Sequence, residues 1–413
     1  IERLTQAGVL TLATPSEAIA RVPAGGLAYL PTASYHEMEL WSLPPVAAES
    51  LERAEAALAD VPGADSATRG GHWRNFLARY AESNRMHKKA QRLSELCRAA
   101  GDPPEARRAI GRAQCNDAYW HGVFGGLYLR HLRDSIWSNL ARAEAVLRAG
   151  EGLAAEWLDV DADGDEELHV HSSRFSAVVR ARRGGALTEL THFATCVNLA
   201  NTLTRRREGY HRTIAPTEAA EAAEAAARAE DGASDAEAMP SIHELEEALR
   251  METLPPVDLD GRALFVDRML PGRLEERSYR DADYGPIHNW ARERFEAVVT
   301  IGSSRVVLAL EAEGVHRLSK TYEIDEAGAV SVTYRWDPAA FPVDALFAPE
   351  ISVEVEPDLR FEPEPTAVWR HPIVTVSKSE EGLEESVQGL SVTPLWPNGL
   401  GRARIRLAAP AED

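Results

Sequence analysis

The stretch QCNDAYWHGVFGG fills residues 114–126 and directly precedes the longest helical pattern of the chain. It combines an amide, a carboxylate, aromatic rings, a histidine and several glycines. Aromatic faces stack on the apolar faces of sugar rings, while amide and carboxylate groups exchange hydrogen bonds with hydroxyls. The residues that fit sugar binding in this way are Asn116, Asp117 and the aromatic residues Tyr119, Trp120 and Phe124.

On a helix, Asp117, Trp120 and His121 could share one face, because residues three or four apart are neighbours there. That spacing is common, so a structural interpretation stands beside sugar binding. In this alternative Tyr119, Trp120 and Phe124 fill the core of a helical bundle and Asp117 caps a helix. The residues alone leave both interpretations open.

Helical patterns lie on both sides of residues 114–126. Downstream, one apolar stripe leads to Gly150, a residue type favoured just after helices. Its members are Leu129, Leu132, Ile136, Leu140, Ala143 and Leu147. Upstream, helices are predicted over 47–60, over 84–100 and from about Glu105. We therefore predict a helical bundle over residues 47–150.

Short alternating runs separated by turns follow residue 151. The clearest are Leu168–Val170, Ala177–Val179, Val306–Leu310, Val330–Tyr334 and Ile351–Val355. Many strands at close spacing favour a sandwich whose side chains alternate between core and solvent. We place a large, mostly antiparallel β-sandwich at 151–413. Within it, residues 217–240 are almost all Ala, Glu, Asp and Gly, which predicts a solvated low-complexity insert.

The first 46 residues contain one short strand candidate, Leu27–Leu30, after Gly25-Gly26. A strand of this length needs neighbours to form a sheet. The chain also begins at Ile1, with neither an initiator methionine nor a targeting segment. We therefore expect the rest of this sheet to be encoded upstream.

The loop PTASYHEMELWSLP follows the strand candidate at residues 31–44. In barrels of parallel strands, loops at the carboxyl ends of strands build the active site. That arrangement would place Tyr35, Glu37 and Trp41 near a substrate. The alternative is a surface loop whose aromatic rings cover the rim of the barrel.

Composition narrows the class of protein. A length of 413 residues suggests two or three domains. The 65 acidic and 45 basic side chains give a net charge of −20, which argues against a nucleic-acid partner. No apolar run approaches the roughly 20 residues that cross a bilayer, so we expect no membrane anchor. The three cysteines fit neither a zinc cluster nor a disulfide framework, which favours a reducing, cytoplasmic location.

Metal and cofactor motifs are scarce. The chain has no HExxH or CxxC pair, no Walker loop, no GxSxG elbow and no GxGxxG after a strand, so we expect neither a cofactor nor a catalytic metal. Asp159, Asp161, Asp163 and Gly164 form a DxDxDG run, but the twelfth position is Val170 rather than glutamate. A hairpin turn is the favoured interpretation, and calcium binding is the weaker alternative.

Three long blocks in this order resemble the glycoside hydrolase family 57 α-amylases and 4-α-glucanotransferases. They are PTASYHEMELWSLP at 31–44, GGHWRNFLARYAESNRMHKK at 70–89 and QCNDAYWHGVFGGLYLRHLR at 114–133. Further stretches resemble the C-terminal β domain of that group: DGD at 163–165, GGALTEL at 184–190, RREGYH at 206–211 and VSKSEEG at 376–382. The resemblance thus touches nearly the whole chain.

The resemblance implies a (β/α)7 barrel, then a helical domain at the barrel mouth, then a β-sandwich. Residues 1–46 would be the end of the barrel, 47–150 the helical domain and 151–413 the sandwich. The family block that contributes to the substrate site matches at Asn116, Asp117, Tyr119, Trp120 and His121. It implies that Asp117 and Trp120 contact the glucan.

The resemblance also implies a retaining mechanism, in which a Glu nucleophile and an Asp acid/base lie about 5 to 5.5 Å apart. Both belong to barrel blocks upstream of Ile1. We therefore predict part of a 4-α-glucanotransferase or α-amylase that acts on α-1,4-glucans, inactive as this chain alone, with a homodimer as one assembly to test. The alternative is a non-catalytic glucan-binding or scaffolding protein derived from that family.

Overall fold

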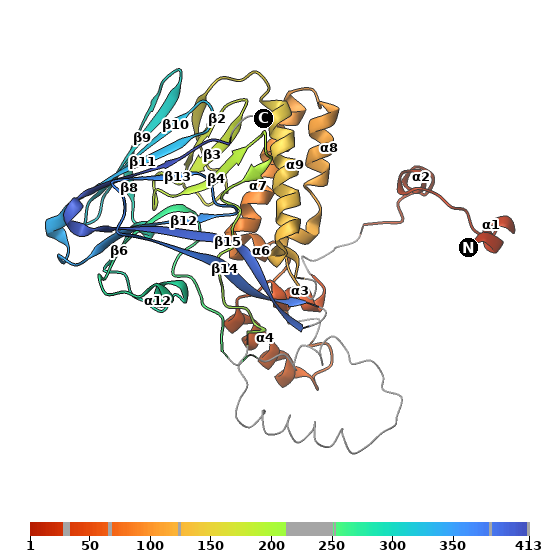
Figure 1. Ribbon diagram of the computed structural model, residues 1–413. Helices are drawn as coiled ribbons and strands as arrows, with labels where there is room; N and C mark the ends of the chain where they lie inside the picture. The colour runs from red at the N-terminus through yellow and green to blue at the C-terminus, as the bar shows by residue number, and fades with distance from the viewer. Residues whose placement is uncertain are drawn as a thin grey trace, which may run out of the picture.

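The computed structural model describes residues 1–27, 34–64, 68–122, 125–211, 251, 253–379 and 382–410. Within these residues the chain forms a layer of helices, a ten-stranded sheet and a six-stranded sheet (Figure 1). The predicted order of helical bundle and then mostly antiparallel sandwich is confirmed. None of the described helices combines the length and the apolar character needed to cross a membrane.

The helical layer follows the apolar stripes of the sequence. Its elements are α3 (His36–Trp41), α4 (Pro45–Leu58), α6 (Asn75–Arg79), α7 (Ala81–Ala99), α8 (Pro104–Arg112) and α9 (Arg130–Leu147). Helix α7 buries Met86, Leu93 and Cys97 against Ile136 and Leu140 of α9, as the three-and-four spacing predicts. The bundle therefore has an apolar core of its own.

The N-terminal region is described as two short helices, α1 (Glu2–Gln6) and α2 (Pro15–Arg21), neither of which buries a residue. Most of the strand candidate at 27–30 lies outside the described residues, and so does the whole insert at 217–240. The assignment of residues 1–46 to the end of a barrel stays a prediction, as do the domain boundaries.

The ten-stranded sheet has the order β1-β2-β3-β4-β6-β12-β15-β14, with β5 beside β4 and β7 beside β6. The strands are β1 (Ala154–Leu158), β2 (Glu167–His171), β3 (Phe175–Val179), β4 (Leu187–His192), β5 (Val197–Asn198), β6 (Leu264–Leu270), β7 (His288–Asn289), β12 (Leu346–Val353), β14 (Ala367–Ser379) and β15 (Gly382–Pro397). Neighbouring strands are antiparallel, and β14 and β15 form one long hairpin.

The six-stranded sheet has the order β13-β16-β11-β10-β9-β8. Its strands are β8 (Phe295–Ile301), β9 (Arg305–Ala312), β10 (Leu318–Asp325), β11 (Val330–Trp336), β13 (Leu359–Glu362) and β16 (Arg402–Leu407). Burial alternates along β9, β10, β11 and β16, because one face packs on the other sheet and the opposite face meets solvent.

The ten-stranded sheet is covered on both faces, and every residue of β2, β3, β4 and β6 is buried. Leu168 and Val170 pack in the sandwich core, whereas the alternate residue His169 faces the helices. This second face is polar: Lys89 of α7 lies 2.6 Å from Glu144 of α9 and also pairs with Glu189 of β4. The helical layer is thus joined to the sheet by buried ion pairs.

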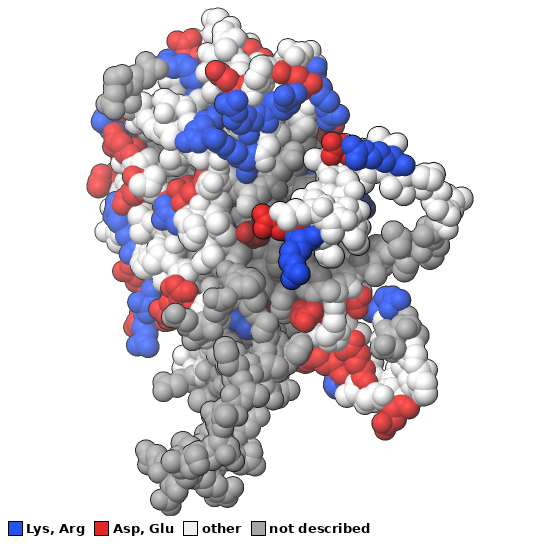
Figure 2. Space-filling model, turned by 90° about the vertical axis from the view of Figure 1, so that its right-hand side faces the viewer, with Lys and Arg blue, Asp and Glu red and all other residues white. Residues whose placement is uncertain are grey.

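Charge is unevenly distributed on the surface. Figure 2 shows the side of the molecule that carries the helices, with Lys and Arg gathered on its upper part and Asp and Glu more frequent below. The net charge of −20 is the sum over the whole sequence, and this face carries side chains of both signs. The prediction that the protein has no nucleic-acid partner was made from the net charge of the whole sequence alone.

Glu82 of α7 joins the helical layer to the segment that follows β5. Its carboxylate accepts hydrogen bonds from the backbone N–H of Thr204 at 3.0 Å and from the Thr204 hydroxyl at 2.7 Å, and it pairs with Arg206 at 2.9 Å. Burial disfavours the charged form, but Arg206, Arg85 and Thr204 outweigh burial and lower the pKa of Glu82 from 4.5 to about 2. A carboxyl whose pKa is depressed on folding stabilises the fold above its unfolded pKa.

We expect the contribution of Glu82 to be complete above pH 4.5 and to be lost as the pH falls toward 2. Glu82→Gln should therefore lower the free energy of unfolding by about 1–2 kcal/mol at pH 7 and flatten its dependence on pH below 5. Urea unfolding at a series of pH values measures both effects. Glu95→Gln, at an exposed position of the same helix, is the matched control. Equal pH profiles for the two variants would contradict the expectation.

Candidate functional site

A pocket of about 530 Å³ opens between helices α3 and α4 on one side and the segment around Glu208 on the other. Its volume lies within the range of roughly 300–1,000 Å³ that is common for small-molecule sites. The lining residues are His36, Leu40, Trp41, Leu43, Pro45, Ala48, Glu49, Glu52, Glu55, Arg79, His121, Gly122, Glu208, Gly209, Tyr210 and Lys378. Two predicted site residues, Trp41 and His121, are among them.

Aromatic rings form one wall of this pocket. Trp41 and Trp120 stack with ring centroids 6.1 Å apart and planes at 19°, and Tyr35 meets Trp41 edge-on at 6.2 Å. Gly122 lies against both indoles, since a Cβ atom there would come within 2.6 Å of the Trp41 ring and 3.0 Å of the Trp120 ring. The glycine after His121 is therefore required for this stack.

The structure corrects the local conformation expected around Asp117. Residues Asn116–Tyr119 form only one 3-10 turn, and Trp120 is extended with φ −144° and ψ 177°. Gly126 adopts a φ of +48°, and a Cβ atom there would lie 2.1 Å from the Trp120 carbonyl oxygen. Because this close approach replaces a regular helix, the expectation that Asp117, Trp120 and His121 share a helix face is wrong.

The predicted residues therefore separate into two groups. Tyr35, Trp41, Trp120 and His121 lie together at or behind the pocket wall. Asn116 and Asp117 are exposed on the 3-10 turn, Glu37 is half-buried in the first turn of α3, and none of the three is among the lining residues. Tyr119 is buried in the bundle core and Trp120 packs against it, as the structural alternative proposed, while Phe124 lies outside the described residues.

A buried polar cluster underlies the pocket, centred on Glu208, whose side chain is 1% exposed. The hydroxyls of Tyr80 and Tyr128 both donate to its Oε1 atom, at 2.7 and 2.6 Å. Arg79 pairs with its Oε2 atom. The Tyr80 oxygen also lies 2.6 Å from Nε2 of His121.

Arg79 connects this cluster to the aromatic wall. Its guanidinium donates to the carbonyl oxygens of Trp41 at 3.2 Å and of Leu43 at 2.6 Å. Sequence reasoning missed Arg79 and Glu208 as site residues, although both lie in blocks, 70–89 and 206–211, that carry the family resemblance. Their spacing alone offered no signal, because the contacts join distant parts of the chain.

Protonation in the cluster follows from burial. Desolvation lowers the pKa of His121 to about 4, although Glu208 opposes this effect. Desolvation and the Glu208 charge raise the pKa of Tyr80 and Tyr128 well above the ordinary value of 10. At neutral pH the pocket floor therefore holds a neutral imidazole and protonated phenols around the pair of Arg79 and Glu208.

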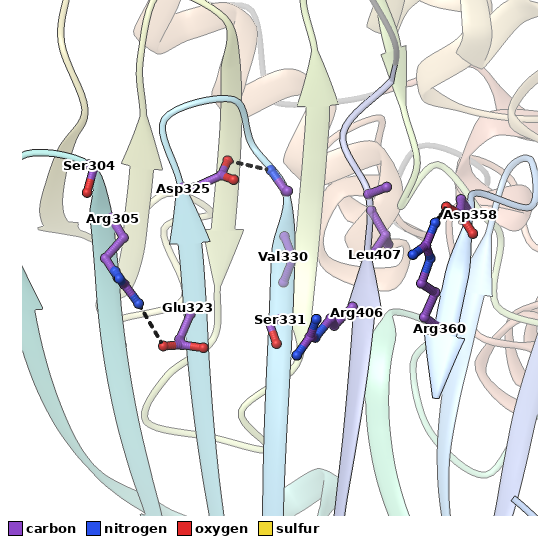
Figure 3. A pocket seen from close by; sticks show the side chains of 12 residues that line it. Ser304, Arg305, Glu323, Asp325, Val330, Ser331, Asp358, Arg360, Arg406 and Leu407 are labelled. Atoms are coloured by element: carbon purple, nitrogen blue, oxygen red, sulfur yellow. Dashed lines mark hydrogen bonds and ion pairs between the residues drawn. The ribbon is translucent and has the colours of Figure 1, made fainter. Parts of the chain in front are cut away.

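A second hollow of about 510 Å³ lies at one end of the six-stranded sheet. Figure 3 shows its charged side chains on neighbouring strands, where Arg305 lies 3.3 Å from Glu323 and Arg360 lies 3.3 Å from Asp358. Among the described residues, no aromatic side chain lines this hollow, so it lacks a surface on which a sugar ring can stack. The pocket at Trp41 is the stronger candidate.

Two further clusters bring metal-ligating atoms together. The carboxylates of Asp159, Asp161 and Asp163 lie within 4.8 Å of one another. Asp159 accepts hydrogen bonds from the backbone of Asp163 and Gly164, both at 3.1 Å, as in the turn that the sequence favours. Calcium binding at this loop stays the weaker alternative.

Sequence reasoning did not foresee the second cluster, formed by Glu156, His169 and His171. Arg92 lies 2.5 Å from Oε1 of Glu156, and Arg148 lies 2.9 Å from Nδ1 of His171. These two guanidinium groups are hydrogen-bonded to the atoms that a metal would need. The geometry is that of an ion-pair network between the helices and β1 and β2.

Comparison with known proteins identifies both halves of the chain. Residues 71–147 match the family described as the middle domain of α-amylase/4-α-glucanotransferase. Residues 159–361 and 354–406 match the C-terminal domain of the same group. The two matches coincide with the helical layer and the sandwich.

Individual relatives belong to the same group of enzymes as these two domain matches. The 4-α-glucanotransferase of Thermococcus kodakarensis is 34% identical over 98% of this chain and 63% of its own length. An α-amylase of Pyrococcus abyssi is 32% identical over 98% of this chain and 63% of its own. The crystal structure of the 4-α-glucanotransferase of Thermococcus litoralis superposes with a TM-score of 0.70 at 29% identity, covering 98% of this chain and 62% of that one.

The chain thus spans about three fifths of these relatives, 62–63% of their length. Its middle and C-terminal domains both match, in the order that the sequence blocks indicated. The chain belongs to the α-amylase/4-α-glucanotransferase family.

Proposed function

We propose that this chain is the later part of a retaining 4-α-glucanotransferase or α-amylase acting on α-1,4-glucans, with the catalytic Glu and Asp located upstream. The observation that carries the proposal is the pocket at Trp41, where an aromatic wall meets a floor of buried polar groups. Stacking of an indole face on a glucose ring, with polar groups placed for its hydroxyls, is the chemistry of sugar binding. The relatives bear the names of such enzymes.

In this proposal each part of the pocket has a task. The Trp41 indole holds a glucosyl ring, and Trp120 supports it from behind. Glu49 and Glu52 of α4 also line the pocket and accept hydrogen bonds from glucose hydroxyls. An acceptor sugar held in this way excludes water from the reacting centre, which favours transfer over hydrolysis.

The remaining predicted residues belong to the periphery of the proposed site. Tyr35 is 52% exposed beside Trp41, and Asn116 and Asp117 face solvent. We assign these residues, with Glu37, to flanking units of a glucan longer than the pocket itself. A cytoplasmic location and a homodimeric assembly are further parts of the proposal.

The second candidate function is glucan binding without catalysis. Both the 413-residue chain and the longer product of the upstream-extended reading frame are to be incubated with maltooligosaccharides, and the product lengths resolved by chromatography. We expect the extended protein to generate new oligosaccharide lengths and the 413-residue chain only to bind. An extended protein that binds maltooligosaccharides but leaves their lengths unchanged would establish the second function instead.

A further inference from the structure

The hydrogen atoms of the Glu208 cluster can be assigned from its contacts. A carboxylate paired with a guanidinium only accepts hydrogen bonds, and a phenol has one proton to donate. Tyr80 donates that proton to Oε1 of Glu208 at 2.7 Å. Its oxygen also lies 2.6 Å from Nε2 of His121, so at this contact it must accept. His121 therefore carries its hydrogen on Nε2.

The remaining ring nitrogen, Nδ1, then has a lone pair. The imidazole is held edge-on between the rings of Phe76, Tyr80 and Tyr128, with centroid distances of 5.4, 5.3 and 5.2 Å. Because His121 also lines the pocket, Nδ1 is the ring atom that remains able to accept a hydrogen bond from a bound ligand.

We propose that Glu208 is a positioning residue: through Tyr80 it fixes His121 in the Nε2–H tautomer, so that Nδ1 accepts a hydrogen bond from a glucosyl hydroxyl. This inference rests on the proposed function for the hydroxyl and on the structure alone for the tautomer. Arg79 completes the arrangement, because its guanidinium pairs with Oε2 of Glu208 while both phenols donate to Oε1.

The groups that face His121 set the pH range of this acceptor. They are the charged pair Glu208 and Arg79, the imidazole of His211, and the phenols of Tyr80, Tyr128 and Tyr210. Burial outweighs the Glu208 charge and lowers the pKa of His121 to about 4. Nδ1 therefore stays an acceptor above about pH 5, and glucan affinity attributable to it falls as the pH drops through 4.

The tautomer is measured directly by NMR of the 413-residue chain labelled with ¹⁵N-histidine, with His121→Gln used to assign the resonance. We expect the Nε2–H pattern at pH 7 in the wild type and in Tyr284→Phe, a half-buried tyrosine that packs on Tyr279 away from the pocket. Glu208→Gln and Tyr80→Phe should shift His121 to a mixture of tautomers or to Nδ1–H. A wild-type Nδ1–H pattern, or a pattern unchanged in both variants, would overturn the inference.

Maltohexaose titration calorimetry tests the glucan contact. We expect about tenfold weaker affinity for Glu208→Gln and for Tyr80→Phe, and near wild-type affinity for Tyr284→Phe. If the two variants change the tautomer but not the affinity, Glu208 still fixes the tautomer in the wild type. His121 is then not the acceptor for a glucosyl hydroxyl. A wild-type chain that binds no maltohexaose would instead refute the proposed function, with the NMR result standing by itself. Because Glu208→Gln and Tyr80→Phe interrupt the same contact in different ways, misfolding of one variant leaves the other as a test.

Discussion

Replacing Lys320 by methionine is expected to lower the free energy of unfolding by about 3–5 kcal/mol, the largest stability effect that we predict. Lys320 of β10 is fully buried, and its Nζ atom lies 2.8 Å from Oδ2 of Asp267 and 2.7 Å from the carbonyl oxygen of Phe265. The rings of Tyr322 and Tyr334 lie 5.2 and 5.5 Å from the ammonium group.

The loss of stability in Lys320→Met arises from Asp267, which remains buried without its ion-pair partner. Burial raises the pKa of Asp267 and lowers that of Lys320, and each partner opposes this shift in the other. Methionine fills the space of the lysine stem but leaves the Asp267 carboxylate without a cation in the sandwich core. A buried charge without a partner costs several kcal/mol, more than the pair itself contributes.

Denaturant unfolding measures this effect, and a second variant separates its cause. Lys320→Met/Asp267→Leu removes both charges and is expected to be more stable than Lys320→Met alone, because no unpaired carboxylate remains. Lys88→Met, at a half-exposed position of α7, is the control for loss of a lysine. A single variant within about 1 kcal/mol of the wild type would show that water or a rearranged neighbour solvates Asp267.

Lys320 also shows how far the sandwich could be predicted from the sequence. Residues 318–325 alternate, so inward positions are recognisable, and the runs at 306–310 and 330–334 were predicted as strands and confirmed. A lysine at an inward position contradicts that pattern. Its partner, Asp267 of β6, lies in the other sheet, and no periodicity within β10 indicates it.

The burial of the polar face of the ten-stranded sheet could not be predicted from the sequence for a similar reason. His169 and Glu189 alternate with apolar residues, which is typical of a strand with one solvent-exposed face. Both are buried because α7 and α9 lie over them, and Lys89 neutralises Glu189. Helical and strand patterns predicted each layer correctly, whereas the contact between layers depends on side chains far apart in the chain.

For the candidate site, residue types were more informative than spacing. The aromatic residues of 31–44 and 114–126 were predicted near a substrate, and the structure brings Trp41 and Trp120 into contact. The helical spacing of Asp117 and His121 was misleading, because Gly126 forces a tight turn that no helix allows. Sequence spacing could not indicate Glu208 as a site residue, because only the folding of the β domain brings it close to the pocket.

Trp41→Ala is expected to weaken maltooligosaccharide binding by about 10–100-fold, the largest effect that we predict on the site. Removing an indole face from a sugar-binding wall forfeits roughly 1.5–3 kcal/mol of buried apolar contact, and each 1.4 kcal/mol is about tenfold in affinity. Trp41→Phe, which keeps a smaller aromatic face, should retain part of the affinity. Titration calorimetry with maltohexaose measures all variants.

The stacked pair allows a sharper test than one substitution. If Trp120 acts by supporting Trp41, Trp120→Ala should weaken binding less than Trp41→Ala, and the double variant should be little worse than Trp41→Ala alone. Trp157→Ala, on β1 beneath Arg182, is the control for loss of a tryptophan away from the pocket. Additive losses would mean that each indole contacts the glucan separately, and wild-type affinity in Trp41→Ala would remove the pocket from the proposed function.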